Sequence, residues 1–124
     1  MDFSVERIKD IMVVKVNFSR ATLKESKELK NILFDGIDIG ERKIIVDLSM
    51  CEFVDSTFMG TLVVSLRKVS ALNGDLKLVE LHPSAMALFE LARLFRIFET
   101  FNSREEAIEN FNKPIAKVNS SEIV

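Results

Sequence analysis

A buried strand that runs almost directly into a helix is the most constraining feature of this sequence. Four apolar residues surround one aspartate in Ile44–Leu48, which is the composition of a strand inside a sheet. Asp55, Ser56 and Thr57 then arrive just before a run of apolar residues with helical spacing. The strand therefore delivers one carboxylate and two hydroxyls to the start of a helix.

The start of this helix gives two interpretations of Ser56. The N–H groups of a first helical turn are unpaired and carry a partial positive charge, so they hold either a hydroxyl as a cap or a phosphate as a ligand. On one interpretation Ser56 is a site of regulated phosphorylation. On the other, Asp55 or Ser56 is only an N-cap, because Ser and Asp are preferred at that position.

The rest of the chain alternates between strand and helix patterns. Period-2 apolar residues on either side of Lys9-Asp10 predict an N-terminal hairpin. The capping boxes Thr22-x-x-Glu25 and Ser103-x-x-Glu106 each predict the start of a helix. The expected helices begin near Leu23, Ser56, Ser84 and Arg104, and the expected strands are residues 3–8, 11–16, 43–48, 76–81 and 96–98.

This order of elements predicts an α/β fold with a single domain. Strand–helix–strand alternation needs crossover connections, so we expect a four- or five-stranded mixed sheet with about four helices packed on it. Apolar residues on both sides of the strand at 43–48 predict helices on both faces. We expect the domain to occupy residues 1–111 and residues 112–124 to form a flexible C-terminal tail, because Pro114 and a polar run lie there.

Composition narrows the classes of function. The 124 residues carry a net charge of −2 at pH 7 without a basic stripe, so no direct nucleic-acid partner is expected. No apolar run reaches the roughly 18 residues that a membrane span needs, so no membrane insertion is expected. Cys51 and His82 are the only cysteine and histidine, which fits a reducing cytoplasm and leaves no soft metal site. Since the chain has no glycine-rich phosphate-binding motif, we expect neither a cofactor nor an enzymatic activity.

The segment Asp55-Ser56-Thr57-x-Met59-Gly60 resembles the motif of STAS domains of the bacterial anti-sigma factor antagonist type. The usual family motif is Asp-Ser-(Ser/Thr)-Gly-Leu-Gly after a strand. Similarity continues in order through residues 74–78 and 84–94 and extends over residues 3–111. The resemblance implies that Ser56, with Thr57 as the fallback acceptor, is phosphorylated by a partner that is both serine kinase and anti-sigma factor.

Two segments depart from the family pattern. Phe58 stands where the family usually has Gly, so it is either buried in the core or exposed, as an anchor for a partner or an obstruction to a kinase. The segment at residues 17–22 replaces the usual Gly-x-(Leu/Ile)-Asp, and Thr22 or a neighbour stands in place of that Asp. Threonine keeps the capping capacity of the aspartate but not its charge.

The resemblance implies an anti-sigma factor antagonist that binds an anti-sigma factor kinase, releases the sigma factor, and is switched off by phosphorylation of Ser56. The alternative is a STAS interaction module without this switch, such as a scaffold or a lipid-transport-associated subunit. Either form fits a monomer or a weak dimer. We expect the partner to contact two segments that lie side by side at the ends of neighbouring strands. The expected partner-binding residues are Ser19, Arg20, Thr22, Asp55, Ser56, Thr57 and Phe58.

Overall fold

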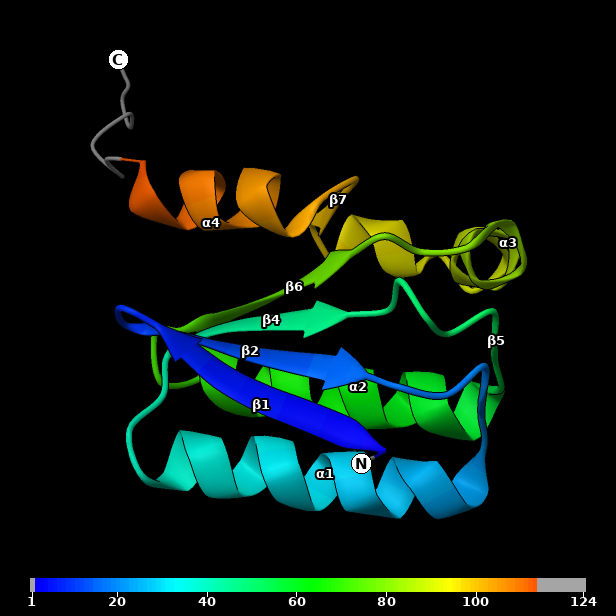
Figure 1. Ribbon diagram of the computed structural model, residues 1–124, viewed down its shortest axis with the longest axis horizontal. Coiled ribbons are helices and arrows are strands. Elements are labelled where there is room, and N and C mark those ends of the chain that lie inside the picture. Colours follow the sequence, from blue (N-terminus) through cyan, green and yellow to red (C-terminus); the bar gives the residue numbers. More distant parts are fainter. Residues whose placement is uncertain (1, 114–124) are drawn as a thin grey trace.

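The computed structural model describes residues 2–113, whose centre is a five-stranded mixed sheet (Figure 1). The strand order is β1-β2-β4-β6-β7; β1 is antiparallel to β2, and the other neighbouring pairs are parallel. The strands of this sheet are β1 (Phe3–Ile8), β2 (Ile11–Val16), β4 (Lys43–Asp47), β6 (Asp75–Val79) and β7 (Thr100–Phe101). A separate two-stranded sheet consists of β3 (Arg20–Ala21) and β5 (Phe53–Val54).

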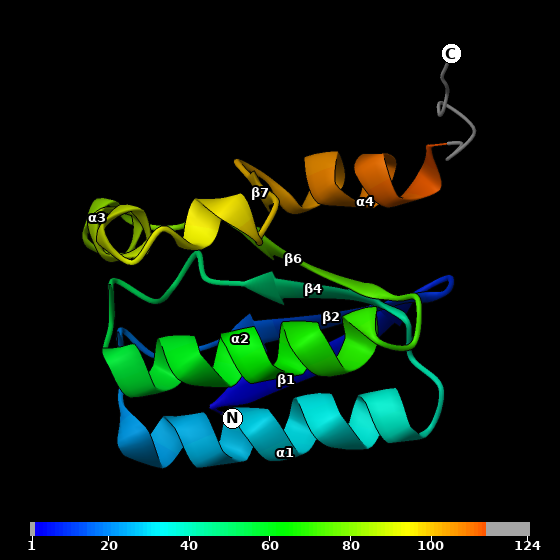
Figure 2. The ribbon, with the colours of Figure 1, turned by 180° about the vertical axis from the view of Figure 1, so that it is seen from behind.

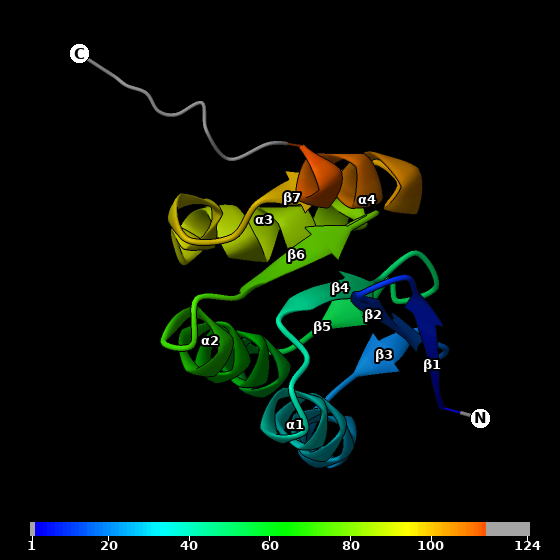
Figure 3. The same ribbon diagram turned by 90° about the vertical axis from the view of Figure 1, so that its left-hand side faces the viewer.

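Helices cover both faces of the main sheet. The helices are α1 (Leu23–Asp38), α2 (Ser56–Ser70), α3 (Pro83–Leu91), the 3₁₀ helix η1 (Leu94–Arg96) and α4 (Arg104–Asn112). Helices α1 and α2 lie side by side against one face (Figure 2), and α4 lies on the other (Figure 3). The crossovers from β2 to β4 and from β4 to β6 both join parallel neighbours, so their shared right-handedness places α1 and α2 on the same face.

Alternate residues of the central strands enter two separate cores. Val14 of β2 and Val46 of β4 are buried in the main core, together with residues of α1 and α2. Their neighbours Val13 and Ile45 point to the opposite face and pack in a smaller core that includes Ala107 of α4. The prediction that the strand at residues 43–48 is covered on both faces is therefore confirmed.

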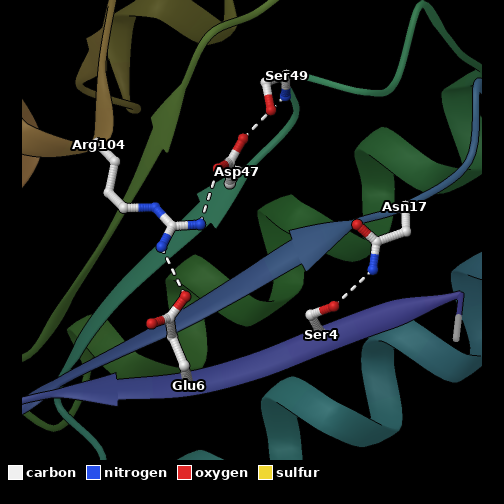
Figure 4. A network of polar contacts seen from close by, with 6 residues as sticks. All are labelled: Ser4, Glu6, Asn17, Asp47, Ser49 and Arg104. Carbon is white, nitrogen blue, oxygen red and sulfur yellow. Dashed lines mark hydrogen bonds and ion pairs between the residues drawn. The ribbon is translucent and has the colours of Figure 1, made fainter.

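A polar network fastens α4 to the sheet beside the smaller core (Figure 4). The Arg104 guanidinium donates to Asp47 Oδ2 at 3.1 Å and to Glu6 Oε1 at 2.6 Å. The Ser49 amide donates to Asp47 Oδ1 at 2.9 Å. Burial alone would raise the pKa of Asp47, but the hydrogen bonds from Ser49 and Arg104 outweigh it and hold the pKa below its usual value.

The predicted architecture is confirmed, since the structure contains a mixed sheet of five strands with four α-helices. The helix starts at Leu23, Ser56 and Arg104 are as expected. Helix α3 begins at Pro83, one residue before the expected Ser84. Proline is well tolerated there because its missing N–H group would be unpaired in a first turn.

The prediction of a last strand at residues 96–98 is wrong. Arg93 adopts a left-handed conformation with φ 58°, and the chain then turns through η1. The Phe98 amide donates to the Leu94 carbonyl at 3.0 Å, so this backbone is satisfied within the turn rather than in the sheet. The apolar character that suggested a strand reflects burial of the Phe98 side chain in the main core. The strand itself, β7, follows at Thr100–Phe101.

The C-terminal limit of the fold lies close to the expected one. Helix α4 ends at Asn112, just beyond the expected domain limit at residue 111. The domain limits and the flexible tail at residues 112–124 stay predictions, because residues 114–124 lie outside the described residues.

Candidate functional site

The first turn of α2 carries the predicted phosphorylation site. Asp55 is its N-cap, with extended backbone angles (φ −98°, ψ 176°) and a carboxylate that accepts from the Phe58 amide at 2.8 Å. The sequence left the cap open between Asp55 and Ser56, and the structure assigns it to Asp55. Ser56 and Thr57 are the first two residues of the helix, and both are exposed. Neither hydroxyl is needed to begin the helix.

The position of Ser56 suits an added anion within this chain. The first N–H groups of a helix have no intrahelical partner, and the helix dipole places a partial positive charge there. The first turn of α2 itself contains no acidic residue, although the Asp55 cap adjoins it. A phosphate on Ser56 would therefore be attracted by the helix terminus and repelled by Asp55.

A short parallel ladder brings the second predicted segment beside α2. Strands β3 and β5 lie next to each other (Figure 3). In their register, Arg20 is opposite Phe53. The Phe53 amide donates to the Ser19 carbonyl at 2.9 Å, and the Asp55 amide donates to the Ala21 carbonyl at 3.1 Å. The prediction that the two segments lie side by side is confirmed. Their roles in binding a partner stay predictions.

Thr22 acts as the N-cap of α1. Its amide donates to Glu25 Oε1 at 3.0 Å, and its hydroxyl donates to the same oxygen at 2.8 Å. The backbone bond, with the hydroxyl bond second, holds the pKa of the Glu25 carboxyl below its usual value. The capping role expected of Thr22 is present. A carboxylate does lie beside Thr22, because Glu25, three residues later, accepts both of these hydrogen bonds.

Of the two alternatives for Phe58, burial in the core is confirmed, and the expectation of an exposed anchor is wrong. Its side chain is fully buried, at 0% exposure, and belongs to the main core. The reason is helical phase. Starting from the Asp55 cap, Phe58 falls on the same face of α2 as Leu62, four residues later, and this face packs into the core. Phe58 is therefore removed from the candidate partner-binding residues.

A different phenylalanine is exposed at this site. Phe53 is 37% exposed, and the Arg20 guanidinium carbon lies 4.4 Å from the centre of its ring. Its neighbour Val54 is buried, and successive residues of a strand point to opposite sides, so Phe53 faces outward. In the sequence, the apolar Val54 next to the Asp55 cap could have indicated this orientation. If Val54 points into the core, its strand neighbour Phe53 points outward.

Cys51 and His82 both hold the loop that follows β4 through contacts with backbone carbonyl oxygens. Burial raises the pKa of the Cys51 thiol to about 11, and its Sγ lies 3.4 Å from the Phe53 carbonyl oxygen. His82 Nε2 lies 2.6 Å from the Ser49 carbonyl oxygen. The Ser84 hydroxyl also donates to the carbonyl of Glu52, so the start of α3 is bonded to this loop at two points. Cys51 and His82 therefore have structural roles in holding this loop.

Two further kinds of feature, a cluster of metal-ligating side chains and a membrane-spanning helix, are absent from the described part of the chain. Within residues 2–113, no group of three or more His, Cys, Asp or Glu side chains is placed to hold a metal ion. No helix among these residues has the length and apolar character required to cross a bilayer.

Comparison with known proteins identifies the family. The family model that describes STAS domains matches residues 2–107 of this chain. The chain belongs to the STAS domain family. Among curated proteins, this STAS chain is 27% identical over 92 residues to BtrV of Bordetella bronchiseptica, whose name assigns it to the anti-sigma factor antagonists. That match covers 74% of this chain and 79% of BtrV.

Solved structures of STAS proteins have the same fold. The crystal structure of TM1081 from Thermotoga maritima, described as an anti-sigma factor antagonist, has a TM-score of 0.85 and 25% identity over 90% of this chain and 95% of that one. The anti-sigma factor antagonist SpoIIAA in its unphosphorylated form has a TM-score of 0.71 and 19% identity over 90% of this chain and 99% of that one. At that identity the likeness to SpoIIAA shows the shared fold alone.

Proposed function

We propose that this STAS domain is an anti-sigma factor antagonist. It binds an anti-sigma factor that is also a serine kinase, causes release of the sigma factor, and loses affinity when Ser56 is phosphorylated. The observation that carries this proposal is the exposed Ser56 hydroxyl on the first turn of α2, next to a separate capping residue, Asp55. The similarity to BtrV and TM1081, both named as antagonists of this kind, supports the general activity.

The separation of the cap from the acceptor explains how the switch acts without unfolding the domain. Asp55 satisfies the Phe58 amide whether or not Ser56 is modified. A phosphate adds about 1.5 to 2 negative charges, which the N-terminus of α2 tolerates. A partner surface that closes over Ser56 has to desolvate this charge next to Asp55, which costs much more than burying a hydroxyl. Binding is lost while the fold is kept.

The partner-binding residues of the proposal are those that border Ser56. They come from the first turn of α2 and from the adjacent segment before α1. All are exposed except Thr22 and Asp55, which are half-buried, and the backbone bonds between the two segments place them close together. The proposed set is Ser19, Arg20, Thr22, Asp55, Ser56 and Thr57.

Phosphorylation by a purified candidate anti-sigma factor kinase with ATP tests the acceptor. Mass spectrometry should place the phosphate on Ser56, and Ser56→Ala should abolish incorporation. Thr57 is the fallback acceptor, because it is exposed on the same turn. Incorporation that survives in Ser56→Ala and disappears in Thr57→Ala would move the switch by one residue. A phosphate found only away from α2 would contradict the assignment.

Calorimetry with the same kinase tests the switch. Ser56→Asp should weaken binding, and Ser56→Ala should bind as the wild type does and resist inactivation by ATP. Ser70→Asp is the matched control, because Ser70 is exposed at the opposite end of the same helix and receives the same charge. A STAS module without a phosphorylation switch would instead bind its partner equally well as the wild type and as Ser56→Asp.

A further inference from the structure

Arg20 and Phe53 form a paired, outward-facing group on the small β3–β5 sheet. They lie opposite each other in the parallel register, and their neighbours Ala21 and Val54 are buried beneath. The guanidinium carbon of Arg20 is 4.4 Å from the ring centre of Phe53, within the range of a cation–π contact. The pair thus presents a half-exposed aromatic ring with a cation stacked on it.

The position of this pair is fixed by several bonds. The Phe53 amide donates to the Ser19 carbonyl at 2.9 Å, and the Phe53 carbonyl is contacted by the buried Cys51 thiol at 3.4 Å. The preceding residue, Glu52, accepts from the Ser84 hydroxyl of α3. A backbone segment held in this way loses little conformational freedom when a partner binds, which favours affinity.

The charge of Arg20 is not neutralised within the described chain. Among residues 2–113, no carboxylate lies within ion-pair distance of its guanidinium, whereas Arg7 pairs with Glu41 and Arg104 with Asp47. The guanidinium carbon lies over the Phe53 ring, and the five N–H donors of the guanidinium are not consumed by a contact of this kind. The donors of Arg20 are therefore available to a carboxylate from another molecule, which they can bind in a bidentate way.

The pair is continuous with the proposed switch. Strand β5 ends at Val54, the Asp55 amide is bonded to the Ala21 carbonyl of β3, and Ser56 begins the helix immediately afterwards. A partner that covers Ser56 would thus also meet the strand pair that carries Arg20 and Phe53. Interfaces concentrate binding energy in a few central aromatic and arginine side chains surrounded by polar contacts.

We propose that Arg20 and Phe53 are the anchor by which this domain recognises its partner, and that the partner presents an apolar pocket bordered by a carboxylate. This inference rests on the proposed function, because the partner is the anti-sigma factor kinase that Ser56 controls. Phe53 fills the pocket, and Arg20 pairs with the carboxylate. A phosphate on Ser56 would repel that same carboxylate, which gives the switch a specific target on the partner surface.

Calorimetric titration of single variants with the purified kinase tests the anchor. Phe53→Ala should weaken binding by about thirtyfold or more, the size of effect that defines an interface hot spot. Arg20→Ala should weaken binding by about tenfold and should also reduce the dependence of affinity on salt, because the lost contact is between charges. Arg20→Lys should bind with intermediate affinity, since it keeps the charge but not the planar, bidentate group.

Matched controls separate the anchor from general effects of the substitutions. Phe95→Ala removes a ring of similar exposure, 39% against 37%, from η1, and Arg67→Ala removes an exposed arginine from the last turn of α2. Both should bind within about twofold of the wild type. Phe53→Leu keeps an apolar side chain at the site, so it should fold even if Phe53→Ala does not, and it should still bind several-fold more weakly than the wild type.

The outcomes distinguish this inference from the proposed function. If the wild type binds, Ser56→Asp weakens binding, and Phe53→Leu, Phe53→Ala and Arg20→Ala all bind as the wild type does, the anchor is overturned and the switch stands. If Arg20→Ala weakens binding equally at all salt concentrations, the carboxylate on the partner is overturned. If the wild type does not bind the kinase, the proposed function and the anchor both fail.

Discussion

Phe58 and Ser56 lie two positions apart on the first turn of α2 and have opposite surroundings. Ser56 is exposed, and Phe58 is fully buried. Phe58→Ala should therefore lower the free energy of unfolding by about 3 to 5 kcal/mol, the usual cost of removing a buried phenylalanine side chain. Phe53→Ala, at a surface position, should cost about 1 kcal/mol or less. Urea denaturation of the two variants makes the comparison, and equal losses would contradict the burial of Phe58.

The reactivity of Cys51 gives a second prediction for a single residue. Because burial raises the pKa of its thiol to about 11, only about one thiol in a thousand is ionised at pH 8 in the folded state. Cys51 is also 0% exposed. An aromatic disulfide reagent should therefore label the folded protein very slowly at pH 8. The same reagent in denaturing urea supplies the control rate, and a folded-state rate close to it would contradict this account.

The sequence predicted the role of a residue well where that role depends on neighbouring residues. It predicted the role poorly where the role depends on contacts with distant parts of the chain. Capping depends on neighbouring residues, so the candidates at the start of α2 included the correct one, Asp55. The orientation of Phe53 depends on pairing with Arg20, more than thirty residues earlier in the chain. The orientation of Phe58 depends on which face of α2 meets the sheet. The signals for these orientations, the spacing of Phe58 from Leu62 and the apolar Val54 beside Phe53, lie outside Asp55-Ser56-Thr57 and identify an orientation only once the long-range contacts are known.

Two glycines in and after α2 should respond in opposite ways to the same substitution. A Cβ atom at Gly60, an exposed helical position, would meet no other atom within 4 Å. Gly60→Ala should therefore stabilise the protein by roughly 0.5 to 1 kcal/mol, because alanine loses less backbone entropy in a helix. A Cβ at Gly74 would lie 2.4 Å from the Arg42 carbonyl oxygen, so Gly74→Ala should destabilise it.

Thermal unfolding of Gly60→Ala and Gly74→Ala checks both signs in one experiment. The clash at Gly74 is with backbone, which cannot move aside as the end of a flexible side chain can. The Gly74 amide also donates to the Val69 carbonyl at 2.8 Å, which fixes the close approach after α2. A melting temperature that falls for Gly60→Ala would contradict the open space around Gly60. One that rises for Gly74→Ala would contradict the close backbone approach at Gly74.

At the scale of elements, periodicity predicted the long helices and strands and missed the shortest ones. The elements α1, α2, β2 and β4 are long enough for a repeat of 3.6 or 2 residues to be visible. Strands β3 and β5 have two residues each, which is too few for any period. Their ladder nevertheless joins the segment before α1 to the start of α2. The part of the fold that assembles the candidate site was therefore the part least visible in the sequence.

At the scale of the whole molecule, the alternation of strands and helices was sufficient to predict the α/β architecture. Parallel strands require crossovers, and right-handed crossovers leave few arrangements of β2, β4 and β6. The sequence did not show how α4 would attach to the second face. That attachment depends on Arg104, which bonds to Asp47 and Glu6 on strands far earlier in the chain.

The Arg104–Asp47 pair should give the folded protein a characteristic dependence on acid. The folded-state pKa of Asp47 lies below its ordinary value, so the unfolded state binds a proton more readily than the folded state does. The contribution of Asp47 to stability is thus fully present above its unfolded pKa of about 3.9 and is lost as the pH falls through the lower folded value. Urea denaturation between pH 7 and pH 2 should show this loss.

Two variants of this pair should each reduce the acid-dependent loss of stability, for different reasons. Asp47→Asn removes the titrating group, so stability at pH 7 should fall and the loss below about pH 4 should become shallower. Arg104→Met removes a hydrogen bond and a positive charge from a carboxylate whose side chain is only 5% exposed. Burial then opposes ionisation with less compensation, so the folded-state pKa of Asp47 should rise towards or above its unfolded value. Stability at pH 7 should fall, and the acid-dependent loss due to Asp47 should shrink or reverse, since its onset is set by the unfolded pKa. Identical pH profiles for the wild type and both variants would mean that this network does not fasten α4 to the sheet, and that the smaller core around Ala107 holds the helix alone.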